Sequence, residues 1–361
     1  MLFRYSKLAP AFFVGTLFSW LQKRGFMILS KRNQHNDAEK LTETYSIAVH
    51  HIMIADKYRV DAYRNAINKV AKGKNVLDIG TGPYAFLAQM AVAANAKHTT
   101  GVEASQESYN AALVQLIPAY SSRLTLENCY STNKIPPEEN SKFDLLIHEI
   151  IGCVGSDEGS LPVVQDAKER LLTKDAQIIP HSFSTHIIPV SPLQELTFIE
   201  SALSRMYMDH KSFFDTEIKS TGIYDVFNFP IENAISEPCI FESFDFNSNF
   251  DLIQKNTNIF EIRNNFKGKP ILFDGFVIFL ELVVNEDNII NSYMQKTNWN
   301  VVYIKLLETA REMQNGDKIK IDCEIDARTV DTKYKLCATL PDGSTLSYEW
   351  NGSNPKAIGK I

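Results

Sequence analysis

The chain has 361 residues, enough for two domains with full cores, and a formal net charge of −6 at pH 7. This acidic balance gives no electrostatic basis for binding nucleic acid and favours a basic protein or peptide segment as partner. The five cysteines, Cys129, Cys153, Cys239, Cys323 and Cys337, are scattered and never spaced CxxC. The pattern argues against a disulfide framework or a zinc site, and predicts a soluble, cytoplasmic enzyme without a metal.

An apolar stretch over residues 8–21 follows two basic residues and has the length of the hydrophobic region of a secretory signal. It is short for a bilayer span, and polar and basic residues follow it in place of a small-residue cleavage site. We therefore expect residues 1–45 to form an N-terminal helical segment without stable membrane insertion. It would dock on the protein, on a dimer mate or on a membrane surface, the first being preferred, and a homodimer stays open.

Residues 51–67 have the pattern of an amphipathic helix, and residues 74–103 that of a βαβ unit. The unit consists of a strand over 75–79, a turn with Gly80 and Gly82, a helix over 85–94 and a strand over 98–102 that ends at Glu103. The glycines allow close approach of a ligand to the backbone, and the acid can accept both hydroxyls of a ribose. A nicotinamide site would need a third glycine where Ala85 stands, and Asp78 is atypical of that fingerprint.

The next apolar strand, over 145–147, leads directly into Glu149, and Glu158 follows nine residues later. Two carboxylates at the mouth of such a sheet suit a guanidinium, whose five donors form a fixed fork and whose charge is permanent. The spacing alone means little in a chain with 43 acidic residues, but its place after a strand favours function over a solvated loop. His148 is expected either as a proton relay to solvent or as a packed histidine at the strand end.

The second half of the chain changes character near Pro180. Before it, a helix over 163–172 and a turn over 173–175 are predicted. After it, β-rich runs lie at 270–284, 319–326 and 332–340, and a polar stretch at 246–258 is expected to form loops between strands. The predicted fold class is α/β: a doubly wound Rossmann-like sheet over residues 46–180, followed by an antiparallel β-barrel over residues 181–361.

The run VLDIGTG over residues 76–82, with Glu103 downstream, resembles the S-adenosylmethionine-dependent methyltransferases. The resemblance implies S-adenosyl-L-methionine as the cofactor, with Glu103 as the ribose clamp. It assigns to cofactor binding Asp78, Gly80, Gly82, Glu103 and Thr132. Tyr84 stands where many of that family have another glycine.

The segment FDLLIHEIIGCVGSDEGS over residues 143–160 is similar to the double-E loop of the protein arginine N-methyltransferases. The residues between the acids are closest to the symmetric-dimethylating branch, and His148 stands where serine is usual. The resemblance implies that Glu149 and Glu158 clamp the guanidinium of an arginine in a protein or peptide. Methyl transfer would then be an in-line displacement, with either glutamate taking the proton.

Two further segments resemble that family. In the helix over 51–67 the resemblance implies that Met53 packs beside the methyl group, that Asp56 faces the cofactor and that Arg59 binds the cofactor carboxylate. The stretch TNWNVVYIKL resembles the Thr-His-Trp loop that closes the acceptor site, with Asn298 in place of histidine, so Asp56 lacks a cationic partner there. Trp299 is expected in this loop or as a buried strand aromatic.

Three functions remain open from the sequence. The first is an S-adenosylmethionine-dependent arginine N-methyltransferase. The departures at Tyr84, His148 and Asn298 leave open a methyltransferase of the same fold that acts on a small guanidine or amine metabolite. The third is a catalytically silent member that binds partners, against which the intact Glu149 and Glu158 count.

Overall fold

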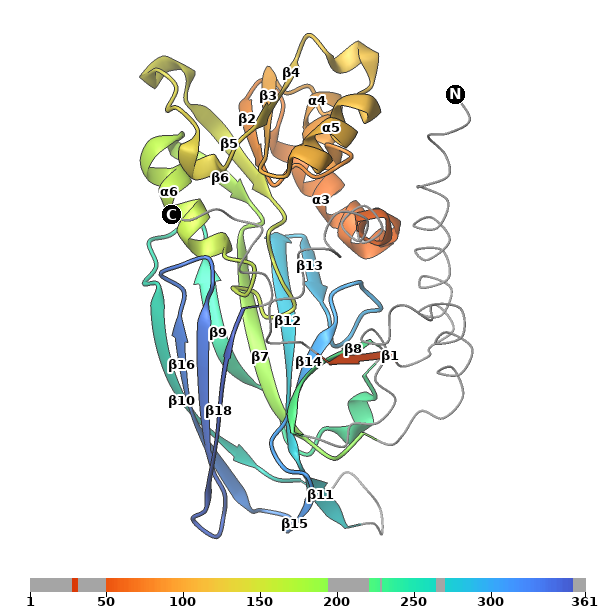
Figure 1. Ribbon diagram of the computed structural model, residues 1–361, viewed down its shortest axis with the longest axis vertical. Coiled ribbons are helices and arrows are strands. Elements are labelled where there is room, and N and C mark those ends of the chain that lie inside the picture. Colours follow the sequence, from red (N-terminus) through yellow and green to blue (C-terminus); the bar gives the residue numbers. More distant parts are fainter. Residues whose placement is uncertain (1–27, 32–49, 194–220, 228, 264–269, 353–361) are drawn as a thin grey trace.

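The computed structural model describes residues 28–31, 50–193, 221–227, 229–263 and 270–352. In Figure 1 an α/β part lies above a long antiparallel β part. Most of the predicted N-terminal segment, including the apolar stretch over 8–21, lies outside the described residues. The exception is β1, Ile28–Lys31, which is a strand rather than a helix and pairs antiparallel with β8, Gly222–Phe227.

Five parallel strands form the sheet of the α/β part, in the order β4-β3-β2-β5-β6. They are β2 Asn75–Ile79, β3 His98–Glu103, β4 Leu124–Asn128, β5 Phe143–His148 and β6 Leu172–Ile179. The chain places β3 and β4 on one side of β2, then returns to place β5 on the other side. The order therefore reverses between β2 and β5, and the loops after these two strands meet at one sheet edge, where doubly wound folds bind ligands.

Within the described part of the chain, α-helices α3 to α6 accompany this sheet, and three short 3-10 helices lie in its connections. They are α3 Lys57–Val70, α4 Phe86–Ala93, α5 Gln106–Gln115, α6 Ser160–Arg170, η2 Pro118–Tyr120, η3 Ser131–Asn133 and η4 Glu139–Ser141. The helix predicted over 51–67 is interrupted, because residues 50–55 form a separate helical segment that ends at Asp56. Asp56 caps α3 by accepting a hydrogen bond from Arg59 N at 3.2 Å.

The turn predicted over 173–175 is wrong, since these residues belong to β6. The register of β6 against β5 shifts, with Phe143 opposite Leu172 and Leu145 opposite Gln177. The intervening residues bulge out of the ladder and are partly exposed, which explains why their sequence resembles a turn.

The described strands of the antiparallel part form three sheets. One has the order β1-β8-β14-β12-β7-β9 with β13 beside β12, the second is β10-β16-β17-β18, and the third pairs β11 with β15. Their further bounds are β7 Ser182–Val190, β9 Cys239–Asp245, β10 Ile253–Glu261, β11 Ile271–Phe273, β12 Gly275–Asn285, β13 Asn288–Asn291, β14 Val301–Lys305, β15 Arg311–Met313, β16 Lys318–Asp326, β17 Lys333–Thr339 and β18 Thr345–Asn351, with the 3-10 helix η5 at Ile231–Asn233. The chain passes from the parallel sheet into β7 around Pro180, the position of the predicted division.

The strands predicted over 319–326 and 332–340 are confirmed as β16 and β17, whereas the run over 270–284 is divided at Asp274 into β11 and β12. The loop predicted over 246–258 is wrong in its second half, where β10 begins. The polar side chains of β10 bond to the backbone of β9: Asn256 Nδ2 donates to Phe241 O at 2.7 Å and Asn258 Nδ2 to Ile240 O at 2.9 Å. The polar side chains that suggested a loop therefore connect the edge strands of two sheets.

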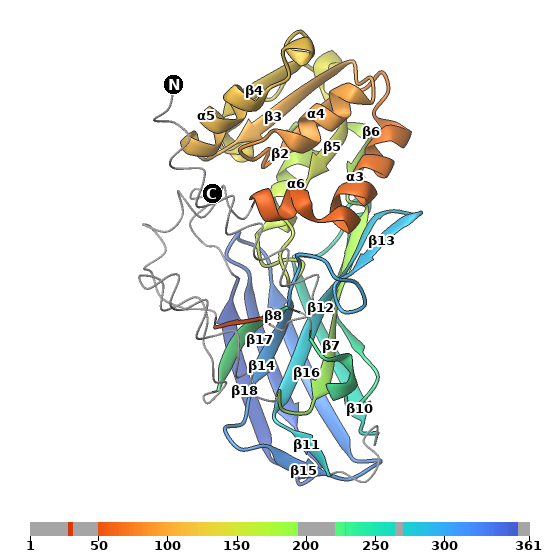
Figure 2. The ribbon, with the colours of Figure 1, turned by 90° about the vertical axis from the view of Figure 1, so that its right-hand side faces the viewer.

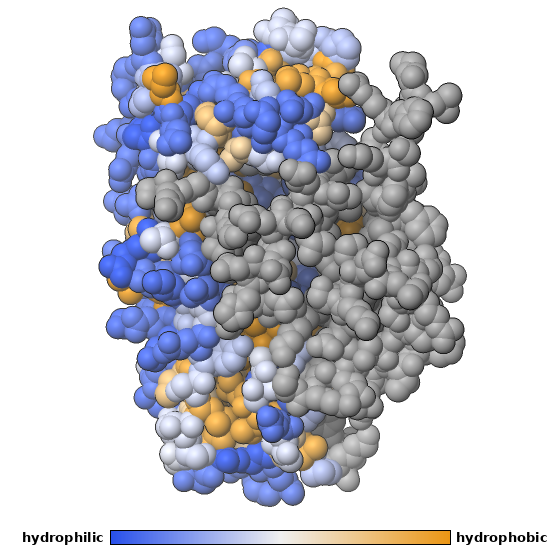
Figure 3. All heavy atoms as spheres, in the orientation of Figure 1, coloured by the Kyte–Doolittle hydropathy of each residue, from blue (hydrophilic) through white to orange (hydrophobic). Residues whose placement is uncertain are grey.

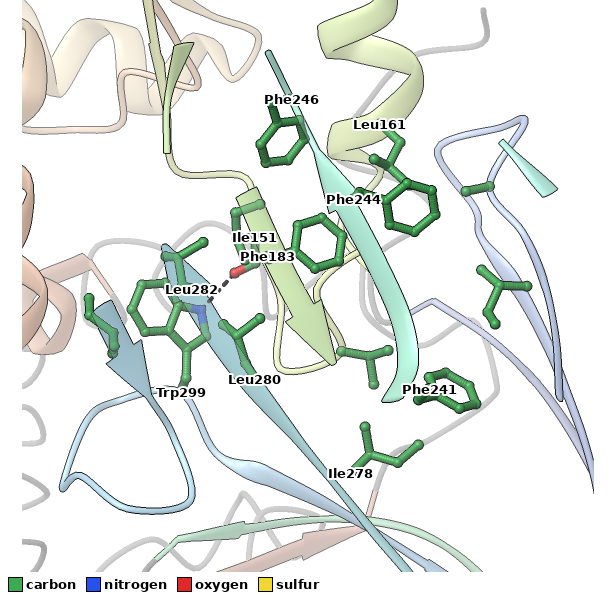
Figure 4. Close-up of a cluster of buried hydrophobic side chains, with 14 of the residues drawn as sticks. Ile151, Leu161, Phe183, Phe241, Phe244, Phe246, Ile278, Leu280, Leu282 and Trp299 are labelled. Carbon is green, nitrogen blue, oxygen red and sulfur yellow. Dashed lines mark hydrogen bonds between the residues drawn. The ribbon is translucent and has the colours of Figure 1, made fainter. Parts of the chain in front are cut away.

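The predicted fold class, a doubly wound sheet followed by antiparallel strands, is confirmed, with the described antiparallel strands in three sheets rather than one closed ladder. Figure 2 shows these strands continuing downward from the α/β part. One of the three apolar clusters among the described residues extends through both parts. In Figure 4, Ile151 and Leu161 lie with Phe183, Phe244 and Trp299 of the antiparallel part. The two parts are thus fixed relative to each other by packing.

Hydrophilic residues dominate the described surface on the face shown in Figure 3. Within the described residues no helix is both long and apolar enough to cross a membrane.

Candidate active site

The loop after β2 is shaped by glycines and by a buried acid. Gly80 and Gly82 have φ angles of 73° and 67°, a left-handed conformation that glycine adopts without steric cost. A Cβ atom on Gly82 would lie 2.9 Å from Cδ2 of His50, so a larger residue would also crowd the helical segment above the loop. Asp78 is 1% exposed and accepts a hydrogen bond from Thr81 Oγ1 at 2.5 Å. Asp78 therefore fixes the conformation of the glycine loop through its hydrogen bond with Thr81.

Burial raises the pKa of Asp78 to about 7, and the hydrogen bond from Thr81 opposes that rise. Its Oδ1 atom is buried without a hydrogen-bond partner among the described residues. Such an acid is costly in a structural turn, which favours a functional role for this loop.

Glu103 ends β3 next to the glycine loop, as predicted. Its Oε2 accepts a hydrogen bond from Gly82 N at 2.9 Å, and its Oε1 accepts one from Ser105 N at 2.8 Å. The carboxylate is thus oriented by two backbone donors and remains partly exposed. A carboxylate has lone pairs for further donors, so ribose hydroxyls can bind to it there.

We call residues 149–159 the glutamate loop. It follows β5, so Glu149 lies at the same sheet edge as the glycine loop. Glu149 Oε1 lies 3.1 Å from Arg59 Nη1, with side-chain exposures of 16% and 6%. Burial raises the pKa of Glu149 to about 7; the Arg59 charge acts against this rise and Asp56 adds to it. The glutamate is therefore close to its titration point at neutral pH.

Arg59 is also stacked on Trp299, with its Cζ atom 3.6 Å from the ring centroid. Trp299 is 3% exposed, and its Nε1 donates to Ile151 O in the glutamate loop at 2.8 Å. Figure 4 shows this hydrogen bond as a dashed line from Trp299, in the segment before β14, to Ile151 in the glutamate loop. Trp299 is a buried aromatic, but it lies two residues before β14 rather than in a strand, and its role in closing the acceptor site stays a prediction.

The segment over 297–299 is joined to the start of α3 by Asp56. Asp56 Oδ2 accepts hydrogen bonds from Thr297 Oγ1 at 2.5 Å and from Asn298 N at 2.7 Å. The side-chain amide of Asn298 donates to Ile52 O at 2.5 Å. The predicted placement of this segment beside Asp56 is therefore observed, and Asn298 serves as a neutral tether in place of a charged partner.

Glu158 is the penultimate residue of the glutamate loop. The last is Gly159, which has a left-handed φ of 76° and directly precedes α6. Glu158 is partly buried. A Cβ atom on Gly159 would lie 2.7 Å from Val330, so the loop closes directly onto the antiparallel part. The position of Glu158 thus depends on the connection between β16 and β17, far along the chain.

His148 does not fit the proton relay. The side chain is fully buried, packs edge-on against Phe246 with ring centroids 4.8 Å apart, and has both ring nitrogens without a hydrogen-bond partner among the described residues. Burial lowers the pKa of His148 to about 3, so the ring is neutral at physiological pH. A relay to solvent needs a hydrogen-bonded path, and the packed alternative describes this residue better.

For two residues assigned to cofactor binding, Met53 and Thr132, the structure shows only backbone hydrogen bonds. Met53 is half-buried in the helical segment over 50–55, and its carbonyl accepts from Asp56 N at 3.1 Å. Thr132 lies in η3, where its carbonyl accepts from Arg170 Nη2 of α6 at 3.1 Å. Their roles stay predictions.

Among the residues that the structure describes, no cluster of His, Cys, Asp or Glu could hold a metal ion.

Sequence reasoning missed Tyr63. This fully buried side chain donates its hydroxyl to His148 O at 3.1 Å, and burial raises its pKa well above the ordinary value. It lies four residues after Arg59 on α3, on the same helix face. This spacing from Arg59 was the sequence feature that could have identified Tyr63.

No protein-family model matches the chain. Among curated proteins, Protein arginine N-methyltransferase 1 of Dictyostelium discoideum is 31% identical over 166 residues, which cover 45% of this chain and 48% of that protein. Protein arginine N-methyltransferase 6 of Xenopus tropicalis is 29% identical over 207 residues, 55% of either chain. The chain thus spans about half the length of these relatives.

Solved structures agree over a longer stretch. The Trypanosoma brucei PRMT1 enzyme-prozyme heterotetrameric complex with AdoHcy contains a chain with a TM-score of 0.63 and 18% identity, covering 84% of this chain and 97% of that one. Arabidopsis thaliana protein arginine methyltransferase 10 has a TM-score of 0.62 and 18% identity, covering 85% and 98%. At this identity the likeness shows the fold, which is that of these methyltransferase structures. In sequence the chain is similar to protein arginine N-methyltransferases over about half its length, which confirms the predicted resemblance.

Proposed function

We propose that this chain transfers a methyl group from S-adenosyl-L-methionine to a guanidinium nitrogen of arginine in a protein or peptide. The observation that carries the proposal is the placement of the partly buried Glu149 after β5, at the sheet edge that carries the glycine loop and where the strand order reverses. The names of the curated relatives support the same reaction class.

The residues of the cofactor half fit this cofactor. Gly80 and Gly82 expose backbone at the loop, and Glu103 is oriented to accept the ribose hydroxyls. Arg59 Nε is buried without a hydrogen-bond partner among the described residues, so this side of the guanidinium can bind a carboxylate such as that of the cofactor, while Nη1 is ion-paired with Glu149. When bound, S-adenosyl-L-methionine supplies an electrophilic methyl group on a sulfonium.

The acceptor half can bind and activate a guanidinium. Glu149 Oε1 is buried without a hydrogen-bond partner among the described residues, although Arg59 lies beside it. A substrate guanidinium can donate to this oxygen and to Glu158, and two carboxylates on one side localise positive charge on the nitrogens they contact. The remaining nitrogen then keeps more of its lone pair for attack. Because its pKa is near 7, Glu149 can take the proton that this nitrogen loses.

The test is incubation of the purified chain with labelled cofactor and a panel of arginine peptides, free arginine, small guanidines and cell extract. We expect methylarginine in peptides or extract proteins, identified by mass spectrometry after hydrolysis. Methylation of only the small guanidines would favour the metabolite enzyme. Cofactor binding without transfer to any acceptor would favour the catalytically silent member.

We also propose that the chain works in the cytoplasm. All five cysteines are free thiols, as is usual in a reducing compartment. Cell fractionation with a specific antibody would test this, and light scattering of the purified chain would test the homodimer, which stays a prediction.

A further inference from the structure

A fully buried glutamate, Glu242, lies under the glutamate loop. It belongs to β9 and is 0% exposed, between the buried Phe241 and Phe244. Burial raises the pKa of Glu242 to about 7, and the hydrogen bonds from Ser156 and Thr185 oppose that rise. Acidic side chains are rarely buried completely. The hydrogen-bond partners of this carboxylate therefore indicate its role.

Three donors converge on Glu242, and two of them come from the glutamate loop. Its Oε1 accepts from Ser156 N at 3.2 Å and from Thr185 Oγ1 at 2.9 Å, and its Oε2 accepts from Ser156 Oγ at 2.6 Å. Ser156 lies between the two glutamates of the loop, two residues before Glu158. One carboxylate of the antiparallel part thus binds the loop through both backbone and side chain.

Neighbouring residues complete the anchorage. Thr185 Oγ1 accepts from Gly155 N at 3.0 Å, Thr332 Oγ1 donates to Ser156 O at 2.8 Å, and Ser156 Oγ lies 2.8 Å from the Tyr334 hydroxyl. A Cβ atom on Gly155 would lie 2.2 Å from the Phe183 ring, so the loop is pressed onto β7 at this point. The middle of the glutamate loop therefore has little freedom to move.

We propose that Glu242 is a positioning residue: its carboxylate holds Gly155 and Ser156 on the antiparallel part, so that Glu149 and Glu158 keep the geometry of the guanidinium clamp. This inference rests on the proposed methyltransferase function. An ionised carboxylate only accepts hydrogen bonds, and it can satisfy all three donors at once. An apolar side chain would leave these buried donors unpaired, and a glutamine would turn a donor toward the hydroxyls.

The test compares Glu242→Leu, which removes all acceptors, with Glu242→Gln, which keeps one acceptor and the shape. Glu349→Gln is the matched control, because this residue lies in a strand of the same part with its carboxylate at the surface, paired with Lys335 at 2.9 Å. The readouts are hydrogen exchange of the peptide that contains residues 149–159, calorimetric cofactor affinity, kcat and KM. All are measured on protein that circular dichroism shows to be folded.

We expect exchange of the loop amides to accelerate by about tenfold or more in Glu242→Leu and by less in Glu242→Gln. The kcat should fall by about tenfold or more in the same order, while cofactor affinity stays within about twofold. If Glu242→Leu does not fold, Glu242→Gln and Thr185→Val provide the same comparison. Glu349→Gln should match the wild type in every readout.

Unchanged exchange of the loop amides in folded variants would overturn the inference whatever the activity. Faster exchange with unchanged kcat would overturn it as well, because the anchorage would then not serve the clamp. A wild type that methylates no acceptor would instead refute the proposed function, and the exchange data would still decide whether Glu242 anchors the loop.

Discussion

The two halves of the candidate site are built in different ways. The cofactor half comes from one βαβ unit, and its hydrogen bond between Gly82 and Glu103 joins residues 21 positions apart. The acceptor half is assembled from distant segments: Thr297 and Asp56 are 241 positions apart, and Trp299 and Ile151 are 148 apart. Local geometry can form the first half, whereas the second exists only when the antiparallel part is docked.

This difference predicts that the two halves can be damaged separately. A change in the glycine loop or in Glu103 should weaken cofactor binding without moving the glutamate loop. A change in the glutamate loop or in the strands beneath it should reduce methyl transfer and leave the cofactor bound. The predictions below test that separation, from the largest effect to the smallest.

The largest effect is expected at the clamp. Glu149→Gln and Glu158→Gln preserve shape but remove the charge that localises the guanidinium, so kcat should fall by about 10²- to 10³-fold. Cofactor affinity should stay within about twofold, because neither residue is needed for the ribose or the glycine loop. Single-turnover methyl transfer and calorimetry on the same preparations measure both quantities.

Glu349→Gln serves as the control for this pair, since its carboxylate is exposed and distant in the chain from both glutamates. Near-normal turnover in both clamp variants would contradict the guanidinium clamp. It would move the acceptor away from the glutamate loop and favour a small-molecule substrate.

The next effect concerns the cofactor half. Glu103→Ala removes the ribose acceptor and the two backbone bonds from Gly82 and Ser105, so cofactor affinity should fall by about 10- to 100-fold, as for one or two charge-assisted hydrogen bonds. Glu139→Ala, an exposed acid of the same part, is the control. Equal affinities in calorimetry would remove Glu103 from the cofactor site.

The cofactor half could be predicted from sequence because its signals are local. Strand β2 was predicted with its observed bounds, and Glu103 lies at the predicted strand tip. The placement of residues 297–299 beside Asp56 followed only from the family resemblance, since no local pattern specifies a contact across 241 positions. The pairing of Arg59 with Glu149 was not predicted, for the same reason.

Glu242 illustrates what sequence patterns cannot show. Strict alternation along β9 would place Phe241 and Glu242 on opposite faces. The register against β7 shifts between Thr185 and His186, so that both side chains are buried. A β-bulge therefore aims an acid into the core beneath the glutamate loop, and a bulge of this kind has no signature in the residues themselves.

A smaller effect is expected in the pH dependence of stability. Burial raises the pKa of Glu149 to about 7, above its ordinary value of 4.5, so the folded state holds this proton more tightly than the unfolded state. The resulting stability is fully present below pH 4.5 and is lost as the pH rises through about 7. Between about pH 5.5 and 7.5, the wild type should lose about 1–2 kcal/mol more unfolding free energy than Glu149→Gln.

Urea unfolding of both proteins across this range measures the difference. Asp78, His148 and Glu242 titrate in both proteins, so their contributions largely cancel in the comparison; the remainder is the small rise in the pKa of Asp78 that the Glu149 charge causes. Parallel stability curves for the two proteins would mean that Glu149 is not buried as the structure places it.

The smallest effect is expected at Asn298, where the two halves of the site meet. Its amide donates to Ile52 O, and its backbone N–H donates to Asp56 Oδ2, so Asn298 itself tethers the segment through uncharged donors. Asn298→His introduces an imidazole beside Asp56, with an unperturbed pKa of about 6.5. We expect a pH–rate profile shifted by about half a unit or a changed ratio of mono- to dimethylated product. Cofactor affinity should change little, because the hydrogen bonds of Asn298 go to Ile52 and Asp56 rather than to Arg59 or Glu103. Mass spectrometry of the product across a pH series tests this, and identical profiles for the two proteins would place the Asn298 side chain outside the acceptor half.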